Sequence, residues 1–247
     1  PAIRGLDFGV KKGEFVSIVG PSGCGKTSVL SIAAGIAVPS GGSVRIEGGR
    51  PGYMLQQDHL LDWRTVEGNI LLGLEVQGNL NEESRSYALE LLKTYGLGEF
   101  AGKYPSQLSG GMRQKVALIR TLACSPELLL LDEPASPLDP LMRDKLCQMI
   151  GDYISDGAGE KSVLFSTHNI SDMESITDYA IIMEHGNVVE CGFVEDLKEK
   201  YILIKGDAQD AEAVSEILYT MTKNPYGFEG ICLAENLDKL AGMNVSK

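Results

Sequence analysis

Two stretches of this 247-residue chain carry residues whose types and spacing suit phosphate chemistry. The first, GPSGCGKT at 20–27, fits the phosphate-loop pattern GxxxxGK[ST], whose small residues let backbone N–H groups curl around a phosphate. Lys26 would reach the β- and γ-phosphates of a nucleotide, and the Thr27 hydroxyl would bind Mg²⁺. The residues predicted to hold the nucleotide here are Gly20, Pro21, Ser22, Gly23, Cys24, Gly25, Lys26, Thr27 and Ser28.

Acidic residues follow a run of leucines in the second stretch, ELLLLDEP at 127–134. Such an unbroken apolar run is typical of a strand buried inside a parallel sheet. Asp132 would help to hold Mg²⁺ through a bound water. Glu133, one residue further, would polarise a water for attack on the γ-phosphate. An ordinary acidic turn is the alternative, and the phosphate loop upstream argues against it.

A third strand pattern, KSVLFSTH, ends in His168. Ligands of open α/β sheets bind at the carboxyl ends of the strands, so we expect His168 to contact the γ-phosphate and help position the water. Gln56 lies in a loop between the sheet and a helical region, where it would coordinate Mg²⁺ and sense the γ-phosphate. Composition alone favours a plain polar loop for Gln56. His59 and His185 lack a comparable setting.

A second anion-binding pattern begins at QLSGGMRQ, residues 107–114. It leads into a helical periodicity that places four apolar residues on one face, Met112, Val116, Ile119 and Ala123. Small residues at a helix start leave N–H groups free to bind an anion at the positive end of the helix dipole. The chain therefore carries two phosphate cradles that lie far apart in sequence.

Alternating strands and helices must position these groups. We expect a strand in the opening PAIRGLDF, a turn at Lys12-Gly13 and a helix over 27–34. Further strands are expected at 15–19, 41–48, 127–134, 161–168 and, as a pair, within 178–192. This alternation implies a largely parallel sheet.

Helical patterns dominate residues 65–125, which suggests a helical insert in an α/β chain. The segment 81–95 predicts an amphipathic helix that Asn81 caps and Gly96 ends. Beyond about residue 200 the pattern changes. We therefore expect a main domain over 1–200 and a small β-α-β-like appendage over 201–247.

Composition restricts the partners. The chain has 34 acidic and 22 basic residues and a net charge of −12, which argues against broad nucleic-acid binding. No apolar run is long enough to span a bilayer and no signal-peptide pattern is present, so a membrane role would require a partner. The five cysteines are scattered and odd in number, which favours free thiols in a reducing cytosol.

The motifs occur in one order: phosphate loop, Gln56, Leu-Ser-Gly-Gly at 108–111, Asp132-Glu133, Asp139 and His168. This order and spacing resemble the ATP-binding subunit of a bacterial ABC transporter over nearly all of residues 1–200, and LSGGMRQ is more diagnostic than the phosphate loop. The resemblance implies an α/β P-loop NTPase of the ABC ATPase type. Its expected parts are a mainly parallel sheet core, an antiparallel β subdomain, a helical subdomain and a small C-terminal appendage.

The resemblance also implies a head-to-tail dimer, homomeric or heteromeric, with two ATP molecules between the subunits. Ser109, Gly110 and Gly111 would contact the γ-phosphate of the ATP held by the other subunit, and Asp139, in the segment that crosses the dimer interface, would also help to bind nucleotide. The helical insert and the loop after Gln56 would contact a membrane permease, so the subunit would lie at the cytoplasmic face of the membrane. ATP and Mg²⁺ are the implied cofactors.

Two halves of the chain resemble different branches of this family. Two segments are similar to the ATPases of nitrate, sulfonate and taurine importers: QDHLLDWRTVEGN, and the stretch from LSGGMRQ to Asp132-Glu133. The chain from VLFSTH onward is instead similar to the ATPases of bacterial exporters. Transport direction therefore stays open. Family members stack adenine on an aromatic residue that precedes the phosphate loop. This chain starts at PAIRGLDF, so we expect either a truncated N-terminus or another stacking group. Pro137 is expected to stiffen the segment that crosses the dimer interface.

Three other functions fit the sequence less well. A DNA-repair ATPase would separate its motifs with a long coiled coil, which the stretch between Lys26 and Leu108 is too short to hold. A ribosome-acting factor would carry two ATPase cassettes in one chain. A nucleotide kinase would leave LSGGMRQ unexplained.

Overall fold

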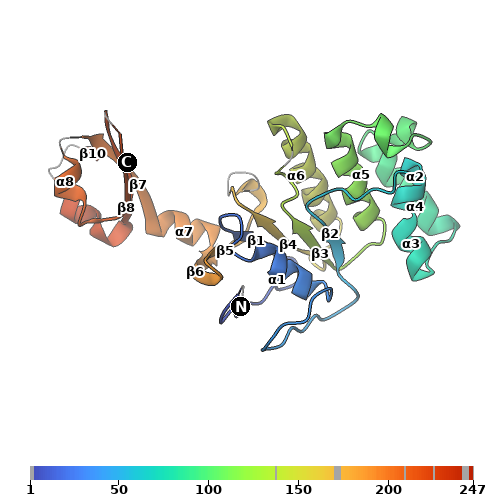
Figure 1. Cartoon of the computed structure of the whole chain (residues 1–247), viewed down its shortest axis with the longest axis horizontal. Coiled ribbons are helices and arrows are strands. Elements are labelled where there is room, and N and C mark those ends of the chain that lie inside the picture. The colour runs from blue at the N-terminus through green and yellow to red at the C-terminus, as the bar shows by residue number, and fades with distance from the viewer. Residues whose placement is uncertain are drawn as a thin grey trace. The chain divides into compact units, whose positions relative to one another are not determined.

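A six-stranded sheet organises the N-terminal part of the chain in the computed structural model (Figure 1). The structure describes residues 3–136, 138–169, 174–208, 210–224, 226–240 and 245–246. The strand order is β2-β3-β4-β1-β5-β6. The strands are β1 (Phe15–Val19), β2 (Gly52–Met54), β3 (Leu128–Asp132), β4 (Ser162–Thr167), β5 (Tyr179–Glu184) and β6 (Asn187–Phe193).

The first five strands pair in parallel. β1 lies between β4 and β5, and β3 lies between β2 and β4. β6 follows β5 through the turn at His185-Gly186 and forms the edge, as expected for a hairpin. The carboxyl ends of β1, β3 and β4 therefore lie next to one another, which brings together the polar segments that follow them.

Helices cover both faces of this sheet. They are α1 (Lys26–Ala33), α2 (Val66–Ile70), α3 (Leu72–Gln77), α4 (Glu82–Thr94), α5 (Gly110–Leu122) and α6 (Pro140–Ser155), with 3₁₀ turns η1 (Gly98–Phe100), η2 (Pro105–Gln107) and η4 (Glu174–Ile176). Leu129 and Leu131 pack into the core beneath α5 and α6. Leu130 packs on the other face with Leu30 of α1. Both faces of β3 are thus buried, which explains its unbroken run of leucines.

Helices α2 to α5 lie within residues 66–122. Asn81 and Ser84 make a capping box at the start of α4, with Ser84 N–H donating to Asn81 Oδ1 and Asn81 N–H donating to Ser84 Oγ, each over 2.9 Å. The chain leaves the helix through Gly96 at φ +74°, a conformation that favours glycine.

Two predicted strands are wrong. Neither residues 3–14, the described part of the opening segment, nor residues 41–48 form a strand. Leu6, Phe8 and Val10 do alternate inward and pack against the core beside β1, but no strand ladder forms with them among the described residues. In 41–48 the side chain of Val44 is 52% exposed. Antiparallel pairing instead involves β6 and the second sheet.

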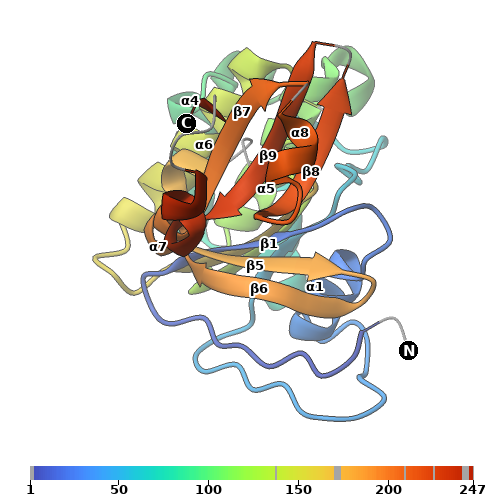
Figure 2. The same ribbon diagram turned by 90° about the vertical axis from the view of Figure 1, so that its left-hand side faces the viewer.

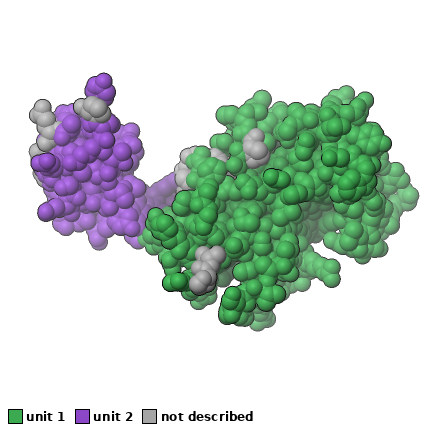
Figure 3. Space-filling model, in the orientation of Figure 1, with its two compact units in different colours: residues 1–191 green, residues 192–247 purple. Residues whose placement is uncertain are grey.

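Residues 1–191 form one compact unit, and a second compact unit spans residues 192–247 (Figure 3). It contains α7 (Val194–Lys200), β7 (Tyr201–Asp207), α8 (Ala211–Val214), β8 (Leu218–Asn224), β9 (Gly227–Leu233), η5 (Ala234–Leu240) and β10 (Val245–Ser246). Its antiparallel sheet has the order β10-β7-β9-β8 (Figure 2). The sheet has more strands than the expected β-α-β arrangement. Residues 218–224 form a strand rather than extending a helix.

No helix in the described part of the chain is long and apolar enough to cross a membrane.

Candidate functional site

The phosphate loop joins β1 to α1, and its glycines are required by space and by backbone shape. A Cβ on Gly20 would lie 2.2 Å from the Met183 carbonyl oxygen, so no larger residue fits against β5. Gly25 has φ +111° and precedes the first turn of α1. No side chain of the described residues caps this helix, so its N-terminal N–H groups point into the loop as an anion cradle.

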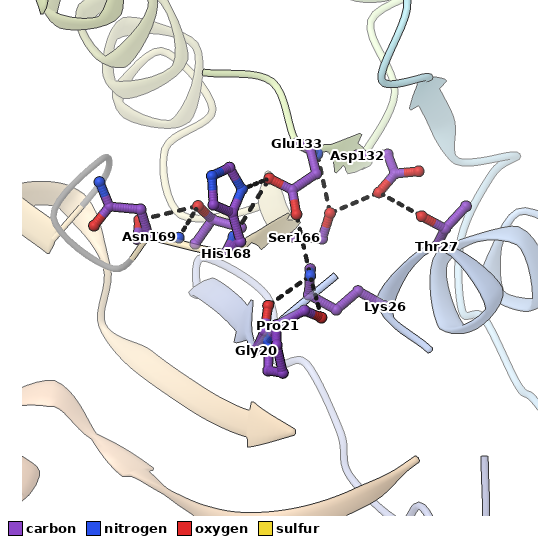
Figure 4. A network of polar contacts seen from close by, with 10 residues as sticks. Gly20, Pro21, Lys26, Thr27, Asp132, Glu133, Ser166, His168 and Asn169 are labelled. Atoms are coloured by element: carbon purple, nitrogen blue, oxygen red, sulfur yellow. Dashed lines mark hydrogen bonds and ion pairs between the residues drawn. The ribbon is translucent and has the colours of Figure 1, made fainter. Parts of the chain in front are cut away.

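Lys26 occupies the centre of a polar network and is only 5% exposed (Figure 4). Its Nζ donates to the carbonyls of Gly20, at 2.7 Å, and Pro21, at 3.2 Å. It also lies 3.1 Å from Glu133 Oε1. A buried ammonium group requires such partners, because it is costly to bury unpaired.

Asp132 ends β3 and faces Thr27 of α1. The Thr27 hydroxyl donates to Asp132 Oδ1 over 3.1 Å. Tyr53 also lies near this carboxylate. Burial raises the pKa of the Tyr53 phenol, and the charge of Asp132 adds to the increase. The phenol is therefore neutral at ordinary pH.

Glu133 connects Lys26 to His168. Its Oε2 lies 2.7 Å from His168 Nδ1 and accepts the His168 backbone N–H at 3.3 Å. A carboxylate only accepts hydrogen bonds, so this contact places a proton on Nδ1. Glu133 adopts φ +47°, a left-handed conformation that is unusual for a non-glycine residue. Strain of this kind clusters at functional sites.

Gln56 follows β2 at the same edge of the sheet but is exposed. The described contacts do not join its side chain to Thr27 or Asp132. Its backbone carbonyl accepts Gln114 Nε2 at 3.5 Å, and the same amide group lies 3.5 Å from the Pro134 carbonyl. The buried Gln114 of α5 thus links the Gln56 loop to the segment after Glu133.

Ser109 is the N-cap of α5, and its hydroxyl accepts the Met112 N–H at 3.3 Å. Ser109 and Gly110 are exposed, and Gly111 is partly exposed. Asp139 likewise caps α6, with Oδ1 accepting the Met142 N–H at 3.0 Å. Neither cap joins the Lys26 network through any described contact. The prediction for Pro137 lies outside the described residues.

A clamp that the motifs do not predict joins the loop after Gln56 to α5. Asp58 accepts a two-pronged contact from Arg113, from Nε at 3.0 Å and from Nη2 at 3.2 Å. Arg120 donates to the backbone carbonyls of Asp58, at 2.7 Å, and His59, at 2.9 Å. The two arginines are seven residues apart, a spacing that puts them on one helix face, and this was the available signal.

Ser166 was also overlooked. It is the penultimate residue of the largely apolar strand β4, and the sequence alone does not show that its hydroxyl faces the acidic residues at the end of β3. Its hydroxyl donates to Asp132 Oδ1 over 2.7 Å.

The site suits a magnesium nucleotide. The Thr27 hydroxyl and the Asp132 carboxylate are oxygen donors, as Mg²⁺ prefers, and Mg²⁺ completes its shell with waters and phosphate oxygens. The described residues contain no cluster of three or more acidic, histidine or cysteine side chains that would form a dedicated metal cage. The anion cradle of α1 and the buried Lys26 suit the phosphates.

The ABC transporter family model matches residues 3–136. The chain is 40% identical to the uncharacterized ABC transporter ATP-binding protein YtlC of Bacillus subtilis, over 90% of this chain and 87% of that protein. It is 36% identical to the taurine import ATP-binding protein TauB of Rhizobium johnstonii, over 86% and 83%.

Solved structures give the same result. The dimeric bacterial ABC transporter cassette MJ0796 matches with a TM-score of 0.71 and 31% identity, over 78% of this chain and 90% of that one. A post-hydrolysis state of the same cassette, bound to ADP and Pi, matches with a TM-score of 0.70. The chain therefore belongs to the ABC transporter family, as an ATP-binding subunit that hydrolyses ATP.

Proposed function

We propose that Lys26, Glu133 and His168 form the hydrolytic centre of this ATPase. The observation that carries the proposal is their direct connection, with Glu133 contacting Lys26 at 3.1 Å and His168 at 2.7 Å. Glu133 is the general base that polarises the attacking water. His168 orients that carboxylate and helps place the water beside the γ-phosphate.

The ion pair sets the order of events within the subunit. Lys26 Nζ must exchange Glu133 Oε1 for phosphate oxygens, and this exchange leaves the Glu133 carboxylate available to a water. Mg²⁺, when bound, neutralises charge that develops on the phosphates. Thr27 and Asp132 are the residues that would hold it, and Gln56, which follows β2, would join them.

Two copies of the chain, or one copy and a related subunit, complete the site. In the single subunit Ser109 and Asp139 stand apart from the Lys26 network, and Ser109 is exposed. We propose that Ser109, Gly110 and Gly111 contact the nucleotide held by the opposite subunit, with Asp139 at the same interface. The dimeric solved cassette supports this arrangement.

Movements of the ATPase subunit during hydrolysis are transmitted to a membrane permease. The clamp between Asp58 and α5 ties the loop after Gln56 to the helix that Ser109 caps, so a permease that contacts this loop is coupled to Ser109. The subunit then lies at the cytoplasmic face of the membrane, and its acidic charge fits a role without nucleic acid.

We further propose that the transporter imports a small polar solute. The relative named for taurine import aligns over 86% of this chain. Proteoliposomes that carry the cognate permease, with ATP supplied on the ATPase side, test the direction. Import predicts that solute accumulates on the ATPase side, whereas solute loss from that side would show export.

The base assignment is tested by Glu133→Gln. The amide cannot accept the proton from water, so turnover should fall by roughly 10²–10⁴-fold. ATP binding should persist, and an ATP-bound dimer should accumulate in size-exclusion chromatography. Normal turnover would contradict the role of Glu133.

A further inference from the structure

Ser166 joins the two acidic residues of the proposed site through one hydroxyl group (Figure 4). Its Oγ donates to Asp132 Oδ1 over 2.7 Å and accepts the Glu133 backbone N–H at 3.0 Å. The pairing of β3 with β4 places Ser166 directly opposite Asp132. Both hydrogen bonds therefore follow from strand register rather than from a flexible loop.

The burial of this hydroxyl makes both bonds costly to lose. Ser166 is 0% exposed and Asp132 is 1% exposed, and a hydroxyl buried without partners would be costly. A bond to an ionised carboxylate is stronger than one between neutral groups. The hydroxyl is thus fixed, and it constrains the carboxylate that it contacts.

Its second bond supports a strained backbone. Glu133 has φ +47°, and such a conformation persists only where neighbouring groups hold it. The Glu133 N–H points at β4, with the Ser166 carbonyl 3.2 Å away in addition to the hydroxyl. This anchoring fixes the direction in which the Glu133 side chain leaves the strand end.

We propose that Ser166 is a positioning residue for ATP hydrolysis. Its hydroxyl orients the Asp132 carboxylate toward Mg²⁺ and holds the Glu133 backbone so that the carboxylate faces the water. The inference rests on the roles proposed above for Asp132 and Glu133. Residues that orient metal-binding groups typically contribute about 10–100-fold to metal affinity or activity.

The same strand offers a matched control at its other end. Ser162 of β4 is also buried, and its hydroxyl accepts the Gly13 N–H at 3.1 Å and donates to the Lys11 carbonyl over 3.0 Å. Ser162 therefore has the same number of bonds in the same strand but contacts no acidic residue through them. Ser162→Ala measures the general cost of removing a buried serine hydroxyl.

The experiment compares Ser166→Ala with Ser162→Ala in the full chain. Mg²⁺ is titrated into protein and a fluorescent ATP analogue, and the midpoint gives the apparent magnesium affinity. We expect Ser166→Ala to raise the midpoint about tenfold or more and to lower kcat more than it changes KM for ATP. Analogue binding in EDTA should be unchanged. Ser162→Ala should leave all four quantities as in the unmodified chain.

Two further variants separate this inference from the site assignment. Asp132→Asn should raise the magnesium midpoint at least as far, and adding Ser166→Ala to it should have little further effect, because the two residues act through one contact. If Asp132→Asn leaves the midpoint unchanged, the proposed site itself is wrong. If Asp132→Asn shifts the midpoint and Ser166→Ala behaves like Ser162→Ala, only the positioning role is overturned. Ser166→Cys, which keeps the volume but donates weakly, replaces the alanine variant if that variant does not fold.

Discussion

At the scale of single residues, the phosphate loop depends on the absence of a side chain at Gly20. A methyl group there would lie 2.2 Å from the Met183 carbonyl oxygen and 2.8 Å from Cys24 Sγ. The carbonyl belongs to β5 and cannot move without disturbing the sheet. The loop and the neighbouring strand are therefore packed as one piece, which fixes the position of Lys26.

Gly20→Ala should lower the free energy of unfolding by about 1–3 kcal/mol, because overpacking forces the backbone apart. ATP affinity should fall with it, since the cradle is displaced. Urea unfolding and nucleotide titration measure both. Gly41→Ala is the control, because a Cβ on Gly41 has no neighbour within 4 Å. Equal behaviour of the two variants would refute the packing argument.

Tyr95 makes the free energy of unfolding depend on pH. Its hydroxyl donates to the Met149 carbonyl over 3.4 Å, and burial raises its pKa to about 12. The unfolded chain loses this proton near pH ~10. Between these values the folded state binds more protons than the unfolded state, so the free energy of unfolding falls as pH rises.

Tyr95→Phe should remove this contribution. Urea unfolding at pH about 9 and about 11.5 should show a smaller loss of stability in the variant than in the unmodified chain. Tyr153 also has a raised pKa but is present in both proteins, so the comparison isolates Tyr95. Identical losses in both proteins would contradict the assigned cause.

At the scale of elements, residues at its own ends specify where α4 begins and stops. Its capping box satisfies N–H groups that the first turn leaves without helical partners. Asn81→Ala should lower the free energy of unfolding by about 1 kcal/mol. Asn79→Ala, two residues earlier and outside the box, should cost clearly less. Urea unfolding distinguishes them, and equal losses would show that the box contributes nothing specific.

Local and long-range signals explain what the sequence could predict. β1, β3 and β4 are buried on both faces, so their apolar runs identified them, and the segments after them carried the candidate site. The described part of the opening segment, from residue 3, has the alternation of a strand but forms no ladder with the described strands, and only the folded sheet reveals this. No turn signal separates the helical pattern of the appendage from LYTMT in β8. The predicted helix therefore extends over residues that form a strand. Ser166 and the Asp58 clamp depend on partners distant in sequence.

At the scale of the whole molecule, no described contact joins Ser109, Gly110 or Gly111 to the phosphate loop of their own chain. Ser109→Ala should therefore leave ATP binding by the isolated subunit intact and lower hydrolysis by about 10²-fold, because one phosphate-binding group is lost only in the assembled pair. Ser106→Ala, an exposed serine in η2, is the control. Nucleotide titration and phosphate release measure the two effects. A matching loss of ATP binding would place Ser109 in the site of its own chain.

The exposed start of α5 has a kinetic consequence. If each reaction centre draws on two molecules, a solution of the isolated subunit contains only half-centres, and their pairing obeys mass action. Hydrolysis per molecule then rises with protein concentration when pairing is weak, and total activity follows the square of concentration at high dilution. A permease that holds two subunits side by side removes that dependence, so the partner sets the rate simply by keeping the halves together.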